Sequence, residues 1–128
     1  MKNQGFIAIS SLLIISTVVL AISLSISLTG INQMNSALGF SKSQETLLIA
    51  QSCTEEAMIR LRRQSSYSTG SLTLGAGSCT INVSGTGSQK TIDIQATIPG
   101  PPQYIKKLQI TAKLLGNSIN IITWQEIE

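Results

Sequence analysis

Hydrophobic residues are concentrated at the start of the chain. Residues 7–28 read IAISSLLIISTVVLAISLSISL, and no charged residue occurs between Lys2 and Lys42. A run of about 20 apolar residues is long enough to cross a bilayer as a helix. In lipid the backbone must satisfy its own hydrogen bonds, which makes a helix the expected state despite many β-branched residues. The pattern therefore predicts a transmembrane helix over residues 6–30.

Small and hydroxyl side chains recur inside this segment at four-residue spacing, at Thr17, Ala21, Ser25 and Thr29. Small residues at such spacing let two helices approach closely in lipid. The alternative is that the hydroxyl groups bond back to carbonyl groups of their own helix. The spacing is compatible with both interpretations.

A helical pattern returns after a mixed stretch that contains Gly30 and Gly39, two candidates for a bend or local melting of the helix. Apolar and small residues then recur at three- and four-residue spacing up to residue 63. This predicts a helical continuation outside the membrane over residues 31–64, with Glu56 and Arg60 as a favourable i,i+4 pair. The expected buried stripe consists of Leu47, Ala50, Cys53, Thr54, Ala57, Met58 and Leu61.

After residue 64 the hydrophobic period changes to two, which is typical of strands. Glycine, proline and asparagine turn signals separate the alternating runs. The pattern predicts an antiparallel meander of about four strands over residues 65–128, with one apolar face packed on the helix stripe. The expected fold class is therefore α+β, a long N-terminal helix on a small antiparallel sheet. The runs lie near residues 72–74, 79–83, 92–96, 104–112 and 119–123.

The chain has two cysteines, Cys53 and Cys79, and no histidine. A structural zinc site needs four nitrogen or sulfur ligands, so no metal is expected. If the domain lies outside the cytoplasm, a disulfide between the helix and a strand is expected, and two separate buried thiols are the alternative. Closing this loop would stabilise the fold by about 3–4 kcal/mol.

The remaining composition argues against nucleic-acid binding and catalysis. The net charge is +3 and aromatic residues make up 4% of the chain. Arg60, Arg62 and Arg63 form a small cluster that fits a solvated helix face better than a nucleic-acid surface. Without histidine, no set of residues indicates general acid–base chemistry, and residues 85–90 lack the spacing of a phosphate loop. We expect no enzyme activity, no cofactor and no nucleic-acid contact.

The first six residues, MKNQGF, form a very short leader with one cation that ends in Gly-Phe and runs directly into the apolar segment. This arrangement resembles the class III signal of type IV pilins and pseudopilins. In that family a prepilin peptidase cuts after the glycine and methylates the new N-terminal phenylalanine. The resemblance implies that residues 1–5 are a prepilin leader, cut between Gly5 and Phe6.

One position departs from the family pattern. Type IV pilins usually carry a glutamate at the fifth mature residue, where this chain has Ser10. In the family that carboxylate pairs with the N-terminal amine of a neighbouring subunit. An unpaired charge at this depth costs about 2.5–3.5 kcal/mol on insertion scales. Absence of the glutamate is typical of some minor pilins (PilX-like subunits) and of tip-located pseudopilins, so the resemblance implies a minor or initiating subunit.

The resemblance also implies a location and partners. It places the chain in the bacterial cytoplasmic membrane as a single-pass protein with its C-terminal domain outside the cytoplasm. Its partners would be membrane lipid, a prepilin peptidase and other pilin or pseudopilin subunits in a pilus or secretion pseudopilus. One alternative is a membrane-anchored binding protein that does not polymerise. Another is a secreted module cut near Ser27 by a signal peptidase.

Overall fold

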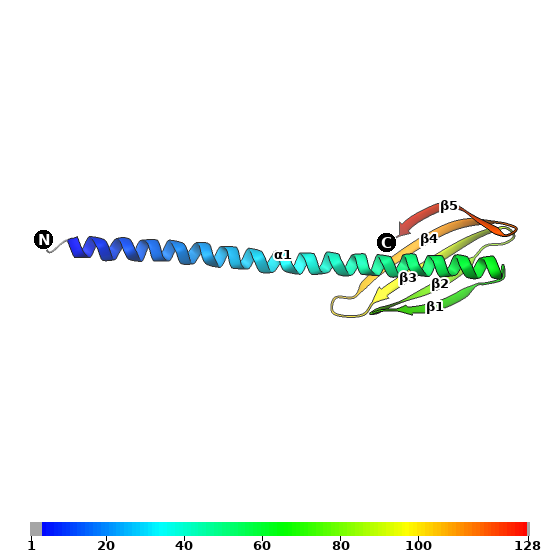
Figure 1. The fold of residues 1–128 in the computed structure, drawn as a ribbon, viewed down its shortest axis with the longest axis horizontal. Helices are drawn as coiled ribbons and strands as arrows, with labels where there is room; N and C mark the ends of the chain where they lie inside the picture. The colour runs from blue at the N-terminus through cyan, green and yellow to red at the C-terminus, as the bar shows by residue number, and fades with distance from the viewer. Residues whose placement is uncertain (1–3, 128) are drawn as a thin grey trace. The chain divides into compact units, whose positions relative to one another are not determined.

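The structure is a computed structural model and describes residues 4–127. Within this range the chain forms one helix and five strands, as drawn in Figure 1. The chain divides into two compact units, Met1–Gly39 and Phe40–Glu128, and α1 contributes to both. The elements are α1 (Gln4–Arg63), β1 (Thr69–Leu74), β2 (Gly77–Ser84), β3 (Gln89–Ile98), β4 (Tyr104–Leu115) and β5 (Ser118–Ile127).

The helix α1 is continuous over 60 residues and includes both glycines that the sequence offered as breakers. Local melting at Gly30 or Gly39 was therefore the wrong expectation. A Cβ added at Gly30 would meet nothing within 4 Å, so no close contact requires glycine there. One glycine costs a helix only about 1 kcal/mol relative to alanine, which the turns on either side outweigh.

The five strands form one antiparallel sheet in the order β1-β2-β3-β4-β5. The α+β prediction is confirmed, with five strands where about four were expected, because the last alternating run forms the complete strand β5. Two of the hairpins turn through only two residues, and each begins with a glycine at positive φ, Gly75 at 58° and Gly116 at 60°. Glycine enters this backbone region without steric cost, which is why tight hairpins use it.

The core of the second unit lies between the C-terminal part of α1 and one face of the sheet. The predicted helix stripe is largely confirmed, since five of its members are buried and Leu47 and Met58 are partly buried. Alternation puts every second strand residue on the same face, where Ile94 pairs with both Ile81 and Leu108. The helix contributes Thr46, Ile49, Ala50, Cys53, Thr54, Ala57 and Leu61 to this core, and the strands contribute Cys79, Ile81, Ile92, Ile94, Ala96, Ile98, Leu108, Ile110 and Ala112.

The edge strand β5 is covered much less than its neighbour β4. Ile121 and Trp124 pair with the buried residues Ala112 and Ile110, yet they remain 42% and 45% exposed. A helix is about 10 Å wide, whereas strands repeat every 4.8 Å or so, and one helix therefore cannot cover a five-stranded sheet. The sequence expectation of an apolar sheet face packed on the helix thus holds for the inner strands and weakens at β5.

Candidate membrane and processing segment

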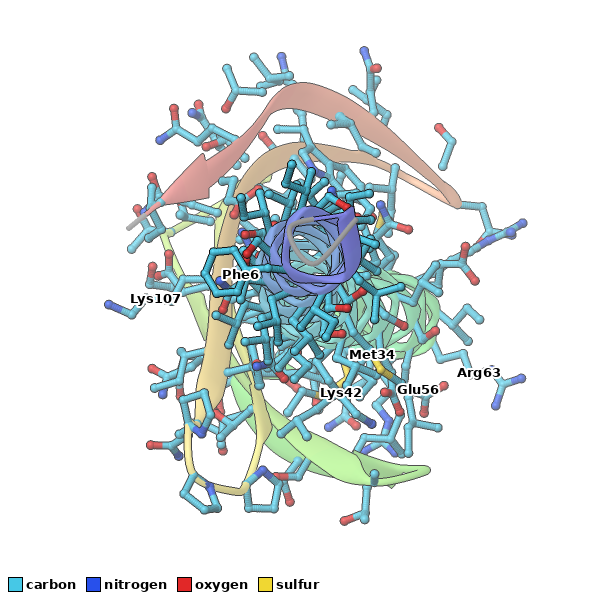
Figure 2. All side chains as sticks on the ribbon, turned by 90° about the vertical axis from the view of Figure 1, so that its left-hand side faces the viewer. Phe6, Met34, Lys42, Glu56, Arg63 and Lys107 are labelled. Atoms are coloured by element: carbon cyan, nitrogen blue, oxygen red, sulfur yellow. A yellow bond between two sulfur atoms is a disulfide. The ribbon has the colours of Figure 1, made fainter. Side chains whose placement is uncertain are left out.

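The apolar segment at the start of α1 is exposed on every side. Its large hydrophobic side chains are all more than half exposed, from 51% at Val18 to 76% at Phe6. Figure 2 looks along this helix and shows side chains projecting around the whole axis. The most apolar window has a mean hydropathy of 2.5 and none of it is buried. By length and composition this is a candidate single membrane span, as predicted.

The hydroxyl groups in this segment bond back to the helix. Ser25 donates to the carbonyl of Ala21 at 2.9 Å, and Thr29 donates to the carbonyl of Ser25 at 2.9 Å. These bonds satisfy the polar groups internally, as a lipid-facing helix requires. One of the two interpretations of the small-residue spacing is thereby shown. The same bond type is made by Ser11, Ser16, Thr17, Ser23 and Ser27.

Close approach by another helix, the other interpretation, has a geometric counterpart on the surface of α1. A hollow of about 330 Å³ lies on the helix surface where small side chains follow one another. Small residues at such positions reduce the distance at which a second helix packs. The hollow is lined by Ser25, Ile26, Thr29, Gly30 and Gln33.

The expected processing residues lie at the first turns of α1. Residues 1–3 of the predicted leader lie outside the described residues, and the helix begins at Gln4. Gly5 is exposed, and a Cβ added to it would meet nothing within 4 Å. Phe6 begins the exposed apolar run, and Ser10 is partly buried, with a hydroxyl that makes no hydrogen bond within the described residues. The backbone around Gly5 is thus accessible, and cleavage there stays a prediction.

Cys53 and Cys79 form the expected disulfide, which excludes two free thiols. The two Cα atoms are 6.6 Å apart, within the usual range for a disulfide. Both residues are at most 1% exposed, so the bond lies within the core. It ties the C-terminal part of α1 to β2, which are the helix and strand layers of the second unit.

Ion pairs at the surface of the second unit join Lys42 to Glu45, Arg60 to Glu56 and Lys106 to Glu126. Glu56 accepts a 2.7 Å hydrogen bond from Arg60, as the i,i+4 spacing predicted. This bond and the charge of Glu56 raise the pKa of Arg60, whose guanidinium also lies 5.7 Å from the centroid of the Tyr67 ring. Arginine is already charged at every physiological pH, so the shift adds no switch.

Within residues 4–127 no three histidine, cysteine or acidic side chains converge in a way that could hold a metal ion. The absence of a catalytic constellation, a cofactor and a nucleic-acid partner stays a prediction.

Polar side chains form a row across the sheet face opposite the core: Gln109 donates to Asp93 at 2.8 Å, and Gln125 donates to Gln109 at 3.0 Å. Alternation indicates the face of each residue, but only strand register aligns the row.

Two features of the second unit were not found from the sequence, the exposed Trp124 on β5 and a cleft beside Arg62 at the end of α1. Both depend on which strand lies at the sheet edge.

Comparisons of the chain with protein-family models, curated proteins and solved structures found no match. A function is therefore inferred from the residues of this chain and their arrangement.

Proposed function

We propose that this protein is a minor type IV pilin-like subunit, a structural component without catalytic activity. The helix over residues 6–30 inserts it in the bacterial cytoplasmic membrane, with the sheet unit outside the cytoplasm. After removal of residues 1–5 by a prepilin peptidase, it joins or initiates a pilus or a secretion pseudopilus. Its partners are membrane lipid, that peptidase and other pilin or pseudopilin subunits.

The observation that carries the proposal is the position of Gly5-Phe6. The dipeptide closes a leader with one cation and stands at the first turns of a helix that stays uncharged up to Lys42. A cleaved secretory signal would have a shorter apolar region, usually 7–15 residues. A leader that ends in Gly-Phe directly before the apolar run, with no spacer between them, is the arrangement that pilin-like signals share.

The second part of α1 supports the same proposal. Instead of ending at the membrane boundary, the helix runs on to Arg63 and becomes the helical layer of a disulfide-linked α+β unit. A membrane anchor by itself needs only about 20 residues. A helix that serves both as apolar segment and as part of a folded domain suits a subunit that passes from membrane to filament.

Ser10 supports the minor or initiating role. Its hydroxyl brings no charge into the apolar segment, and residues 4–39 contain no charged side chain at all. A subunit that has no neighbour to pair with avoids the insertion cost of an unpaired carboxylate when this position is neutral. The repeating subunits of a shaft have such a neighbour and usually retain the glutamate.

The test is the intact mass of the full chain purified from membranes of a host that carries a prepilin peptidase. We expect loss of residues 1–5 and gain of one methyl group. The Gly5→Ala variant should remain uncut but inserted in the membrane. Alanine fits at this position without a clash, so any loss of processing reports recognition by the peptidase rather than damage to the helix.

Gly30→Ala is the matched control, because it makes the same chemical change in the same helix at another open position. It should be processed like the wild type. An uncut wild-type chain would favour a membrane-anchored protein that does not polymerise, and a chain starting near Leu28 would favour a secreted module. Normal maturation of Gly5→Ala would contradict the pilin-like assignment.

A further inference from the structure

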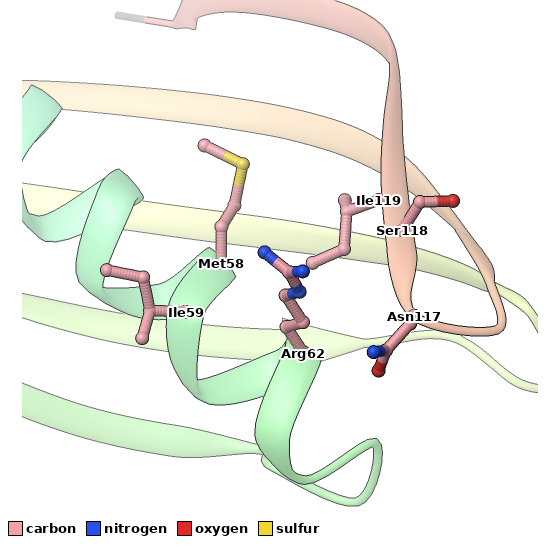
Figure 3. A pocket seen from close by; sticks show the side chains of 6 residues that line it. All are labelled: Met58, Ile59, Arg62, Asn117, Ser118 and Ile119. Atoms are coloured by element: carbon pink, nitrogen blue, oxygen red, sulfur yellow. The ribbon is translucent and has the colours of Figure 1, made fainter.

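An open cleft lies within the second unit, between the last turns of α1 and the hairpin that joins β4 to β5. Its volume is about 350 Å³. Figure 3 shows the Arg62 side chain extending between Met58 on the helix and Ile119 on β5. The lining residues are Met58, Ile59, Arg62, Asn117, Ser118 and Ile119. A second hollow of about 460 Å³ shares Ile59, Arg62 and Asn117 and extends the cleft past Arg63.

The cleft exists because β5 projects beyond the area that the helix covers. Ile119 packs against the edge of the core, while Ile59 on the adjoining turn of α1 stays 48% exposed. The two-residue turn at Gly116 and Asn117 brings the start of β5 beside the helix end. An apolar floor is thus left that no element within residues 4–127 covers.

The charge in the cleft is not compensated by the described part of the chain. Among residues 4–127, Arg62 and Arg63 have no ion pair, whereas Arg60 is paired with Glu56. No carboxylate lines either hollow. The free carbonyl groups at the end of a helix favour nearby cations, but their partial charge of about half a unit does not neutralise two guanidinium groups.

We propose that this cleft binds an acidic peptide segment of a partner protein, one in which a carboxylate side chain lies next to an apolar one. Arg62 offers the planar donor pair that holds a carboxylate at two points. Asn117 offers both a donor and an acceptor for the peptide backbone. Met58 and Ile119 receive the apolar side chain. This binding does not depend on the pilin-like function.

The shape of the cleft favours a peptide over a small molecule. Small-molecule sites are usually concave and bury most of the ligand surface. Here two adjoining hollows share Arg62 and open along the end of the helix, which suits an extended chain that stays partly exposed. The combination of cations and apolar side chains selects for an amphipathic acidic sequence over a purely acidic or purely apolar one.

The experiment is an NMR titration of the full chain in zwitterionic detergent micelles. The probe is a short peptide with one glutamate flanked by leucines, and the control probe replaces the glutamate with glutamine. We expect the signals of Asn117, Ile119 and the Met58 methyl group to shift with the glutamate peptide. The glutamine peptide should bind about tenfold or more weakly, because a charge-assisted bond is lost.

Arg62→Gln should weaken binding of the glutamate peptide about tenfold or more. It replaces an exposed side chain that has no ion pair among the described residues, so the spectrum of the folded core should stay unchanged. Lys113→Gln is the matched control, because it removes one exposed cation from β4 and should leave binding unchanged. Equal binding of the two peptides, full binding by Arg62→Gln, or absence of shifts at the cleft would each overturn the proposal.

Vesicles that contain phosphatidylglycerol separate the peptide from a lipid headgroup. The proposal requires that Arg62→Gln leave the amount of full chain bound to these vesicles unchanged. Loss of vesicle binding in that variant, without loss of peptide binding, would assign the cations to lipid and overturn the proposal as well.

Discussion

The two parts of α1 share a secondary structure and differ in how they distribute apolar residues. In the first unit every large hydrophobic side chain up to Leu28 is more than half exposed. In the second unit the helix sorts its residues, so that Ala50 and Ala57 are fully buried while Leu48 on another face is 62% exposed. Helices with apolar residues all round lie in lipid or in a large core, which makes the first part of α1 a candidate membrane span, whereas the second part has one buried and one exposed face.

The two units can also be compared through single hydroxyl groups on α1. Ser25 in the first unit and Thr54 in the second both donate to the carbonyl four residues earlier at 2.9 Å. Ser25 is exposed on the apolar segment, whereas Thr54 is fully buried in the core. Both sites lack water in the proposed setting, and an unsatisfied hydroxyl would cost free energy in either. The same hydrogen bond to the carbonyl four residues earlier thus satisfies the hydroxyl group in both surroundings.

The largest expected effect comes from comparing an isoleucine-to-alanine substitution in one unit with the same substitution in the other. Ile110→Ala removes a fully buried side chain and should lower the free energy of unfolding by about 2–5 kcal/mol. Ile14→Ala, at a position 64% exposed, should leave it unchanged. Urea unfolding in detergent, followed by the fluorescence of Trp124, reports on the sheet unit because the chain has one tryptophan. Equal losses in both variants would contradict the division into two units.

The disulfide should contribute only to the second unit. Breaking the bond between Cys53 and Cys79, which closes a loop over a sequence separation of 26, should cost about 3–4 kcal/mol of unfolding free energy. The same fluorescence measurement with and without reductant tests this without any substitution. As a control, reductant should have no effect on the Cys53→Ala, Cys79→Ala double variant. An unchanged urea midpoint in reduced wild-type protein would show that packing alone holds the layers.

A charge placed on each part of α1 tests directly whether the first part lies in lipid and the second part in water. Val18→Lys puts an ammonium group on the apolar segment and should cost about 2.5–3.5 kcal/mol of insertion free energy. Leu48→Lys places the same group on an exposed face of the sorted part and should cost nothing. The measurement is the carbonate-resistant fraction of each variant in membranes. Similar fractions for both would argue against lipid as the solvent of the first unit.

The smallest effect is expected at the surface ion pair of the second unit. Glu56→Gln removes the partner of Arg60, and both side chains are substantially exposed. Exposed pairs of this kind contribute little because water and salt screen them. The urea midpoint should not change measurably, and the pKa of Arg60 should lose the upward shift that Glu56 causes. A midpoint shift as large as that of Ile110→Ala would mean that the pair orders the helix end.

Periodicity along the chain predicted the type and order of the elements, although about four strands were expected where five form. The uncharged run predicted the apolar helix, the return of three- and four-residue spacing predicted the stripe from Leu47 to Leu61, and alternation predicted the strands. With only Cys53 and Cys79 in the chain, the disulfide had one possible intramolecular pairing. The helix and strand patterns are local, because residues close in the sequence form them, and the disulfide pairing follows from the number of cysteines. Gly5, Phe6 and Ser10 likewise stand in the sequence, and their role remains a prediction.

The tertiary structure decided what depends on distant residues. Strand register aligned Asp93 with Gln109, and the edge position of β5 left Trp124 exposed and opened the cleft beside Arg62. The sequence could not show these features, because the width of one helix against five strands determines which strand stays uncovered. Residue spacing described what each part of the chain would form, and packing alone determined which side chains stayed exposed.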